Sequence, residues 1–171
     1  MLTESRHGNK AAMQKTNNLV QLLTFKLDDQ EYALNIANVV QVVRMVALTR
    51  PPQAPDYIDG IFNLRGKVIP VINIRKRCGL RSKSPDLDTQ LLIARADGRT
   101  MAIAVDVVSE VLALPTERLE PPEQIGPEMK FLSAVGKVDD RLILILDPNT
   151  LLTNGNGPLQ LEPAEKVGLA V

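Results

Sequence analysis

The stretch YIDGIFNLRGKVIPVINIRKRCGL, residues 57–80, contains two apolar segments of strand length joined by the tight step Asn63-Leu64-Arg65-Gly66. A glycine at the end of such a step gives the backbone the freedom that a turn between two strands requires. We therefore predict that Arg65 lies on a turn between two β-strands. A run of cations without an acid among them follows the turn, and the question is what Arg65 and this run bind.

The rest of the chain has the same pattern of strands and turns. From Leu19 onward, short segments rich in Val, Ile and Leu alternate with turn residues, which is typical of an all-β protein. Three further hairpins are predicted, with turns at Asp28-Asp29, Asp97-Gly98 and Asp139-Asp140.

The chain also resembles itself. Shifted by 69 positions, residues 32–43 match residues 101–112 in apolar pattern, and a shift of 74 places residues 68–73 over residues 142–147. Each unit of about 65 residues would be marginal alone, because so small a domain buries little apolar area. We therefore predict two packed β-barrels with a shared core.

The predicted boundaries follow from this repeat. Barrel one covers about residues 19–84 and barrel two about residues 85–150, with short helical turns and a short C-terminal helix at Pro-Asn-Thr-Leu-Leu. Residues 1–18 are polar and are predicted to be a disordered tail, and residues 154–171 a weakly structured one.

The composition argues against several classes of protein. No apolar run approaches the roughly 18 residues of a membrane span, and no signal peptide is recognisable, so we expect a soluble cytoplasmic protein. The single cysteine, Cys78, excludes an internal disulfide and a cysteine-based zinc site. We expect it to be a partly buried filler.

Catalysis is not expected. The only histidine, His7, lies in the N-terminal tail, so no histidine-based nucleophile, general base or metal site can form on the folded part. There is no phosphate-binding glycine-rich loop. The acids lie mainly in turns, where solvated charges are usual. We therefore predict a protein that is not an enzyme and needs neither cofactor nor metal.

The cationic run has three interpretations: a solvated surface, a site for an acidic protein partner, or a site for single-stranded nucleic acid. Nucleic acid is the least favoured, because the chain has no net charge and only 3% aromatic residues for base stacking. Charge is unevenly divided, with a net of +5 over residues 19–85 and −6 over residues 86–150. This polarity suits a contact with another two-barrel protein, although independent drift of the two halves would also produce it.

Four segments resemble one known family. GIFNLRGKVIPVINIR is similar to the signature of the CheW-type chemotaxis coupling adaptors, G-x-x-N-L-R-G-x-x-x-P-x-x-D-L-R. The segments QEYALNIANVVQVV, VDVVSEVL and DDRLILILDPNTLL resemble further elements of that family, in order, so that the likeness covers about residues 19–153.

The resemblance implies a fold and a function. The fold would be two five-stranded SH3-like barrels. The function would be that of a cytoplasmic, non-enzymatic adaptor between the coiled-coil tip of a chemoreceptor and the regulatory domain of a sensor histidine kinase. An alternative is the same scaffold in a system that controls twitching or surface sensing.

The resemblance also implies site residues. A receptor-binding groove would include or adjoin Val39, Gln41, Gly60, Asn63, Arg65 and Gly66. Turn geometry is a competing explanation for the two glycines, and core packing is one for Val39. The kinase would contact the cationic run, with Lys76 and Arg77 as candidates.

Two family acids are replaced in this chain. Gln41 stands where the family usually has Glu, and Asn73 where it usually has Asp, while the second repeat retains Glu110 and Asp147. By resemblance, Arg65 would face the neutral amide of Gln41 in place of a carboxylate.

Overall fold

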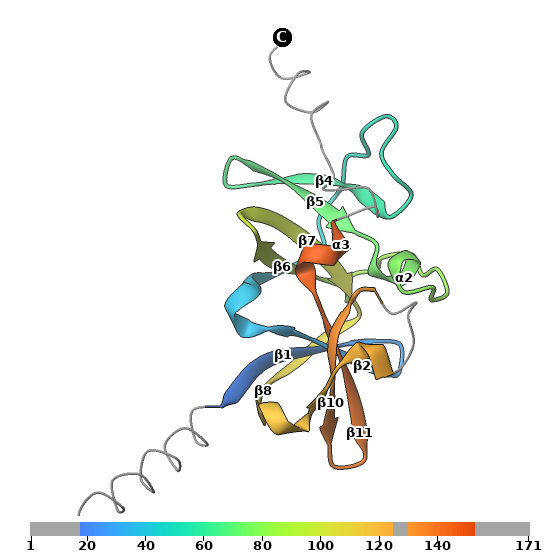
Figure 1. Ribbon diagram of the computed structural model, residues 1–171. Helices are drawn as coiled ribbons and strands as arrows, with labels where there is room; N and C mark the ends of the chain where they lie inside the picture. Colours follow the sequence, from blue (N-terminus) through green and yellow to red (C-terminus); the bar gives the residue numbers. More distant parts are fainter. Residues whose placement is uncertain (1–17, 125–129, 153–171) are drawn as a thin grey trace, which may run out of the picture.

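The computed structural model describes residues 18–124 and 130–152, and this part of the chain is built mainly from strands (Figure 1). The strands are β1 (Leu19–Leu27), β2 (Gln30–Asn35), β3 (Val39–Arg44), β4 (Ile58–Leu64), β5 (Lys67–Ile72), β6 (Gln90–Ala96), β7 (Arg99–Val105), β8 (Val107–Pro115), β9 (Leu119–Glu120), β10 (Leu132–Val138) and β11 (Arg141–Leu146). The α-helices α2 (Ile74–Arg77) and α3 (Pro148–Leu151) are each one turn long. The all-β prediction is confirmed. The two predicted tails lie outside the described residues, apart from Asn18.

The four predicted turns are present. Each joins neighbouring antiparallel strands through a two-residue loop, and the residue that opens it adopts a left-handed backbone with φ between 51° and 55°. The opening residues are Asp28, Arg65, Asp97 and Asp139. The predicted helical turn after β5 and the helix after β11 are also confirmed, as α2 and α3.

The strands form two sheets. Sheet A has six strands in the order β8-β1-β2-β11-β10-β9, and sheet B has five in the order β3-β6-β7-β5-β4. The predicted boundary between residues 84 and 85 does not separate these sheets. Sheet A combines β1 and β2 with four later strands, and sheet B contains β6 and β7, so each sheet draws on both halves of the chain.

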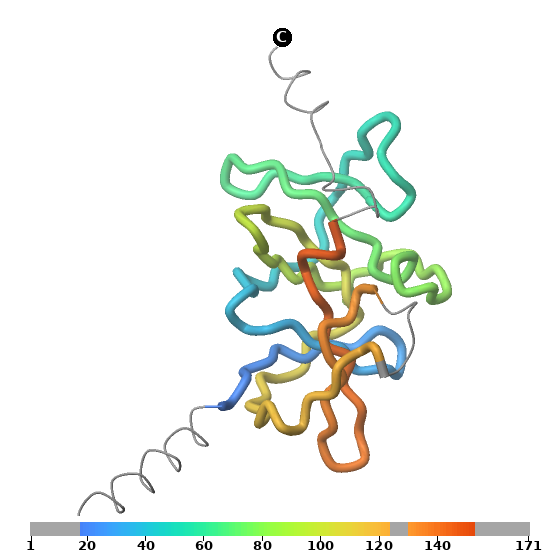
Figure 2. Tube along the Cα trace, viewed as in Figure 1, coloured from blue at the N-terminus to red at the C-terminus, as the bar shows by residue number. Residues whose placement is uncertain are grey.

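The two halves exchange their first hairpins. Hairpin β1–β2 pairs with β8 and, in parallel, with β11, whereas the matching hairpin β6–β7 pairs with β3 and, in parallel, with β5. Figure 2 shows the blue N-terminal trace lying among the yellow and orange C-terminal segments. The sequence repeat is therefore real, but its units are interlocked.

The two sheets end in equivalent contacts. After β3, Thr49 crosses to β4 and exchanges two backbone hydrogen bonds with Ile61, of 2.9 and 2.7 Å. After β8, the short strand β9 pairs with β10 in the same way. In sheet B, β3 and β4 are the two edge strands. This contact therefore places the segment that follows β3 beside β4. Closure of a complete barrel stays a prediction.

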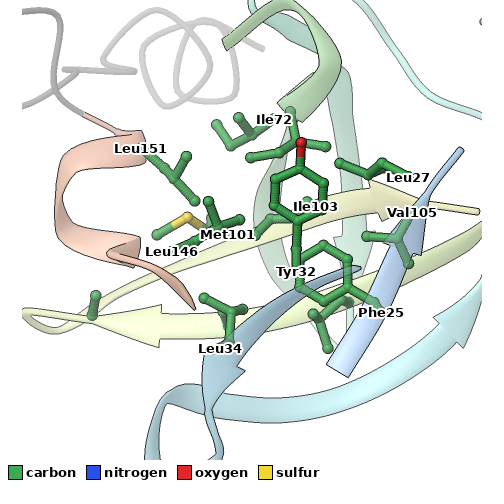
Figure 3. Packing of buried hydrophobic residues seen from close by; sticks show 14 of the residues in the cluster. Phe25, Leu27, Tyr32, Leu34, Ile72, Met101, Ile103, Val105, Leu146 and Leu151 are labelled. Carbon is green, nitrogen blue, oxygen red and sulfur yellow. The ribbon is translucent and has the colours of Figure 1, made fainter. Parts of the chain in front are cut away.

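The largest hydrophobic cluster lies between the sheets. Phe25, Leu34 and Leu146 of sheet A pack in one cluster with Ile72 and Ile103 of sheet B (Figure 3). Each sheet also has a small cluster of its own. The prediction that stacking two small units supplies a shared core is confirmed.

Candidate functional site

The turn between β4 and β5 presents Arg65. The side-chain oxygen of Asn63 accepts a 2.8 Å hydrogen bond from the backbone N–H of Gly66, which fixes the turn, and Gly66 has φ +85°. The guanidinium of Arg65 is exposed and makes no hydrogen bond or ion pair with any described residue. Asn63 and Gly66 therefore shape the turn, and Arg65 is available to a partner.

The residue type at Arg65 is unusual for its backbone. A left-handed φ disfavours most side chains, and Asp and Asn tolerate it better than others do. The other three hairpins place Asp at this position, with φ of 51°–55°, whereas here Arg65 has φ +52°. An arginine in a backbone conformation that disfavours it indicates that the side chain is needed for something other than folding.

Gly60 serves the packing of the backbone. A Cβ atom at this position would lie 2.8 Å from the Cβ of Leu48 and 3.0 Å from the carbonyl oxygen of Thr49. Only glycine allows β4 to approach the segment after β3 so closely. The close approach of β4 to the segment after β3 therefore explains a glycine here, and a receptor contact at Gly60 stays a prediction.

Strand β3 changes face at a bulge between Val39 and Gln41. Val39 pairs with Ala94 and packs against the main cluster, whereas the half-buried Gln41 pairs with Ile93, which belongs to the separate cluster of sheet B. Exposed valines in this region were not singled out from the sequence. They are Val40 (54% exposed) and Val42 (37%) of β3 and Val46 (43%) in the segment after it.

The predicted groove residues lie on or beside two strands of sheet B, and the groove itself stays a prediction. Gly60, Asn63, Arg65 and Gly66 are on or beside β4, which is one edge of sheet B, whereas Val39 and Gln41 are on β3, the other edge. No hydrogen bond joins Gln41 to Arg65 among the described residues. The resemblance implies that they face each other, and this stays a prediction.

The contacts of Asn73 explain why an amide suits this position, where the family usually has aspartate. Its side-chain oxygen accepts a hydrogen bond from the backbone N–H of Lys76 at 3.0 Å and so caps α2. Its side-chain nitrogen donates to the carboxylate of Asp59 at 2.9 Å. A second carboxylate could cap the helix but would repel Asp59, so the amide suits both neighbours.

The cationic run is not one solvated surface. Arg75 is buried and forms ion pairs with Asp28 and Asp106. Lys76 is exposed, and its ammonium group donates to the carbonyl of Asp56 at 3.2 Å. Within a single turn of α2, one cation is therefore internal and the next is accessible.

Arg77 is held within the fold. Its guanidinium lies 3.6 Å from the ring centre of Tyr57 and 4.9 Å from that of Phe131, and it donates to the carbonyl of Leu151 at 2.8 Å. Burial lowers the pKa of this guanidinium from its ordinary value. The side chain therefore ties α2 to the end of α3, and its role as a kinase contact stays a prediction.

The charge polarity persists when the chain is divided by sheets. Residues 39–106, which contain sheet B, have eleven Lys and Arg against six Asp and Glu, a net of +5. The described residues that contain sheet A, 18–38, 107–124 and 130–152, have five against ten, a net of −5. The polarity therefore belongs to the two structural units and not to an arbitrary cut in the sequence.

Other kinds of site were sought in residues 18–124 and 130–152. These residues contain no group of three or more His, Cys, Asp and Glu side chains that could hold a metal ion. No helix among them is long and apolar enough to cross a membrane. Burial raises the pKa of Cys78 to about 11, which keeps this half-buried thiol protonated and unreactive at neutral pH.

Comparison with known proteins gives one consistent result. Residues 21–155 match the family described as the CheW-like domain. Chemotaxis protein CheW of Helicobacter pylori is 31% identical over 150 residues, which are 87% of this chain and 90% of that protein. Chemotaxis protein CheW of Rhizobium meliloti is 30% identical over 139 residues, 80% of this chain and 90% of that protein.

The fold is similar to a crystal structure. The scaffolding protein TtCheW from Thermoanaerobacter tengcongensis superposes with a TM-score of 0.76 at 32% sequence identity. The superposition covers 82% of this chain and 97% of that one.

Proposed function

The chain belongs to the CheW-like domain family, and we propose that it is a cytoplasmic, non-enzymatic adaptor that couples chemoreceptor tips to the regulatory domain of a sensor histidine kinase. The family and the relatives support a chemotaxis scaffold. The assignment of particular surfaces to the receptor and to the kinase rests on the geometry of this chain.

Arg65 is the observation that carries the receptor assignment. Its guanidinium projects from a fixed turn and has no partner among the described residues. A guanidinium can bind a carboxylate through two parallel hydrogen bonds, which gives both direction and specificity. An acidic side chain near the tip of a receptor hairpin would therefore be a suitable partner.

Exposed valines in and after β3 would supply apolar contact. Val40 and Val42 of β3 and Val46 in the segment after it are exposed. A helical receptor tip presents apolar side chains at intervals of three and four residues, which can pack on exposed valines. In this proposal Arg65 orients the receptor, and the valines contribute buried apolar area.

The charge polarity supports the kinase assignment. A unit with a net charge of +5 and a unit with −5 can each meet a complementary unit of a second protein with the same fold. Such complementarity mainly raises the association rate and selects the partner. Lys76 is the accessible cation of α2, so it replaces the pair Lys76 and Arg77 as the candidate contact.

The direct test is co-purification of the tagged chain from its native cells, with mass spectrometry of the bound proteins. We expect one histidine kinase and one or more chemoreceptors. An Arg65→Ala chain, which removes the free guanidinium and no internal contact, should lose the receptors and keep the kinase. Recovery of nucleic acid, or of neither signalling partner, would contradict the proposal.

A further inference from the structure

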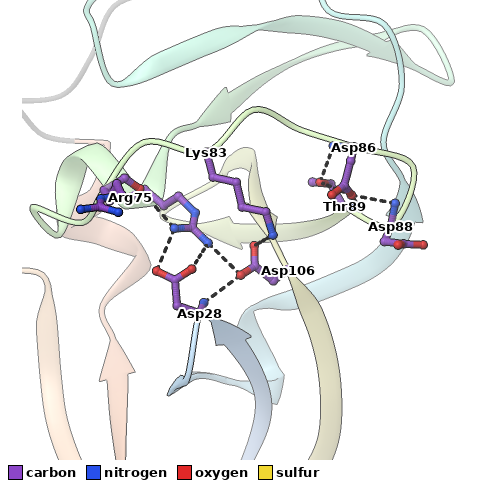
Figure 4. Close-up of polar contacts among 8 residues, drawn as sticks. Asp28, Arg75, Lys83, Asp86, Asp88, Thr89 and Asp106 are labelled. Atoms are coloured by element: carbon purple, nitrogen blue, oxygen red, sulfur yellow. Dashed lines mark hydrogen bonds and ion pairs between the residues drawn. The ribbon is translucent and has the colours of Figure 1, made fainter.

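Four charged side chains meet at one point between the sheets (Figure 4). The guanidinium of Arg75, whose side chain is 9% exposed, contacts both carboxylate oxygens of Asp28 at 3.0 Å and one oxygen of Asp106 at 2.7 Å. The ammonium of Lys83 lies 3.6 Å from the other oxygen of Asp106. Asp106 also accepts a 2.8 Å hydrogen bond from the backbone N–H of Asp28.

This cluster joins three separate parts of the chain. Asp28 is in the turn of hairpin β1–β2, Arg75 is in α2 after β5, and Asp106 is at the crossing from β7 of sheet B to β8 of sheet A. The backbone N–H of Asp106 also donates to the carbonyl of Lys26 at 3.1 Å. The tip of a sheet A hairpin is thereby fixed to elements of sheet B.

The cluster lies where the backbone pairing between β1 and β8 ends. The pairing of β1 with β8 ends at Lys26 and Val107, so the turn at Asp28 lies beyond the last pair of that ladder. Hairpin β1–β2 is also the first hairpin of the described chain and is joined to the other strands only through its C-terminal end. On the side of β8 its tip therefore depends on other contacts, whereas on the side of β2 pairing with β11 begins at Glu31.

The equivalent hairpin has no such cluster. The repeat shifts place Asn149 opposite Arg75 and Ala37 opposite Asp106, and the turn residue Asp97 opposite Asp28. Asp97 forms no ion pair with any described residue. Hairpin β6–β7 is connected to neighbouring strands at both of its ends, so its position is constrained by the chain itself.

We propose that Arg75, Asp28 and Asp106 form a clasp that locks the tip of the exchanged hairpin β1–β2 onto sheet B and sets how often that tip opens. The shared hydrophobic cluster holds the sheets together, and the clasp provides the directional contact at their margin. Hairpin β1–β2 has one covalent connection to the other strands, and hairpin β6–β7 has two. The clasp holds the tip of β1–β2 as firmly in place as that of β6–β7.

Hydrogen exchange of the full chain tests the clasp, with β6–β7 as an internal reference. In Arg75→Gln, the backbone amides of Asp28 and Asp106 should exchange at least about tenfold faster, because charge-assisted bonds are lost at a locally opening site. Amides at Ala96 and Arg99 should change much less. Arg75→Lys, which keeps the charge but not the two-pronged geometry, should recover part of the protection.

A matched control is the ion pair between Lys137 and Glu120, 2.6 Å apart, which lies within sheet A. Lys137→Gln should leave exchange at Asp28 and Asp106 unchanged. If Arg75→Gln does not fold, Asp28→Asn offers a milder change at a half-exposed residue and should accelerate exchange in the same direction. Equal acceleration at both hairpin tips, or no acceleration at either, would overturn the clasp.

Discussion

Sheets A and B are built on one plan, and their interiors have remained alike. The repeat shifts that align the sequence also align four of the five buried residues in each of the two small hydrophobic clusters. The matched pairs are Leu22 with Leu91, Ala33 with Ala102, Ile143 with Ile69, and Ile145 with Val71. Close packing tolerates only small changes of volume, which explains why these matched pairs are identical or similar in size.

The polar positions of the two sheets have diverged. Arg65 of sheet B corresponds to Asp139 of sheet A, with the same left-handed backbone and the opposite charge. Arg75 corresponds to Asn149, and only Arg75 joins an ion cluster. Since the fold is common to both, the functions proposed for each sheet must depend on these differences.

The largest effect on stability is expected at Gly60, where the backbone contacts of the two sheets differ. Gly60→Ala should reduce the free energy of unfolding by about 2–3 kcal/mol, because the new Cβ would collide with Leu48 and Thr49. Sheet A already has Ala134 at the matching position, so Ala134→Gly should cost only about 0.5–1 kcal/mol. Urea denaturation of both variants would check this, and equal losses would show that the two positions are packed alike.

The second prediction concerns the removal of Arg75, which has no cationic counterpart in sheet A. Arg75→Gln should cost about 2 kcal/mol at neutral pH, since charge-assisted hydrogen bonds to two acids are lost. The Arg75 hydrogen bond holds the pKa of Asp28 below its ordinary value. Burial acts to raise the pKa of Asp106, but hydrogen bonds from Asp28 and Arg75 outweigh it, so this pKa is also lowered.

The sign of the pH dependence follows from these lowered pKa values. Carboxyl groups with a folded pKa below the ordinary 3.8 stabilise the fold above that pH, and the stabilisation is lost as pH falls through the folded values. The stability gap between wild type and Arg75→Gln should therefore shrink below about pH 4. Urea midpoints from about pH 6 to about pH 2.5 would measure it. A constant gap would contradict the assigned ion pairs.

A third prediction concerns the amide that replaced an acid. Asn73→Asp should cost about 1 kcal/mol, because the new carboxylate would lose the hydrogen bond to Asp59 and repel it. The double variant Asp59→Asn with Asn73→Asp should recover most of this loss, as measured by denaturation. Asp147→Asn in sheet A should have a smaller effect, since an amide oxygen can also accept from Asn149. A double variant no better than Asn73→Asp would show that Asp59 is not the cause.

The smallest effect is expected at Gln41. No bond joins Gln41 to Arg65 among the described residues, so Gln41→Glu should change stability by less than about 1 kcal/mol, even if the new carboxylate attracts Arg65 from a distance. A larger gain in a thermal or urea unfolding experiment would mean that the two side chains do meet in solution.

The sequence predicted the local features of the fold well. Asp28, Asp97 and Asp139 identified their turns because few residue types tolerate a left-handed backbone. The repeat was visible because both halves fill equivalent interiors. The exchange of hairpins was not predictable, since the apolar pattern of a strand shows which face is buried but not which distant strand lies beside it.

The candidate site was predicted less completely. Arg75 and Arg77 were grouped with surface cations because charged side chains are rarely buried unless paired. Their partners, Asp28, Asp106 and the ring of Tyr57, are distant in sequence, so no local signal marked the pairing. The receptor-binding role of the turn residue Arg65 was predicted through the family signature. The exposed valines in and after β3 were overlooked.

The central claim is that the charge on the sheet B turn binds the receptor and that the equivalent turn of sheet A does not. Binding of a purified receptor cytoplasmic fragment should be measured by titration for wild type, Arg65→Ala and Asp139→Ala. We expect Arg65→Ala to weaken binding by about tenfold or more, because a charge-assisted contact is lost, and Asp139→Ala to leave it unchanged. Undiminished binding by Arg65→Ala, or an equal loss in both variants, would contradict the claim.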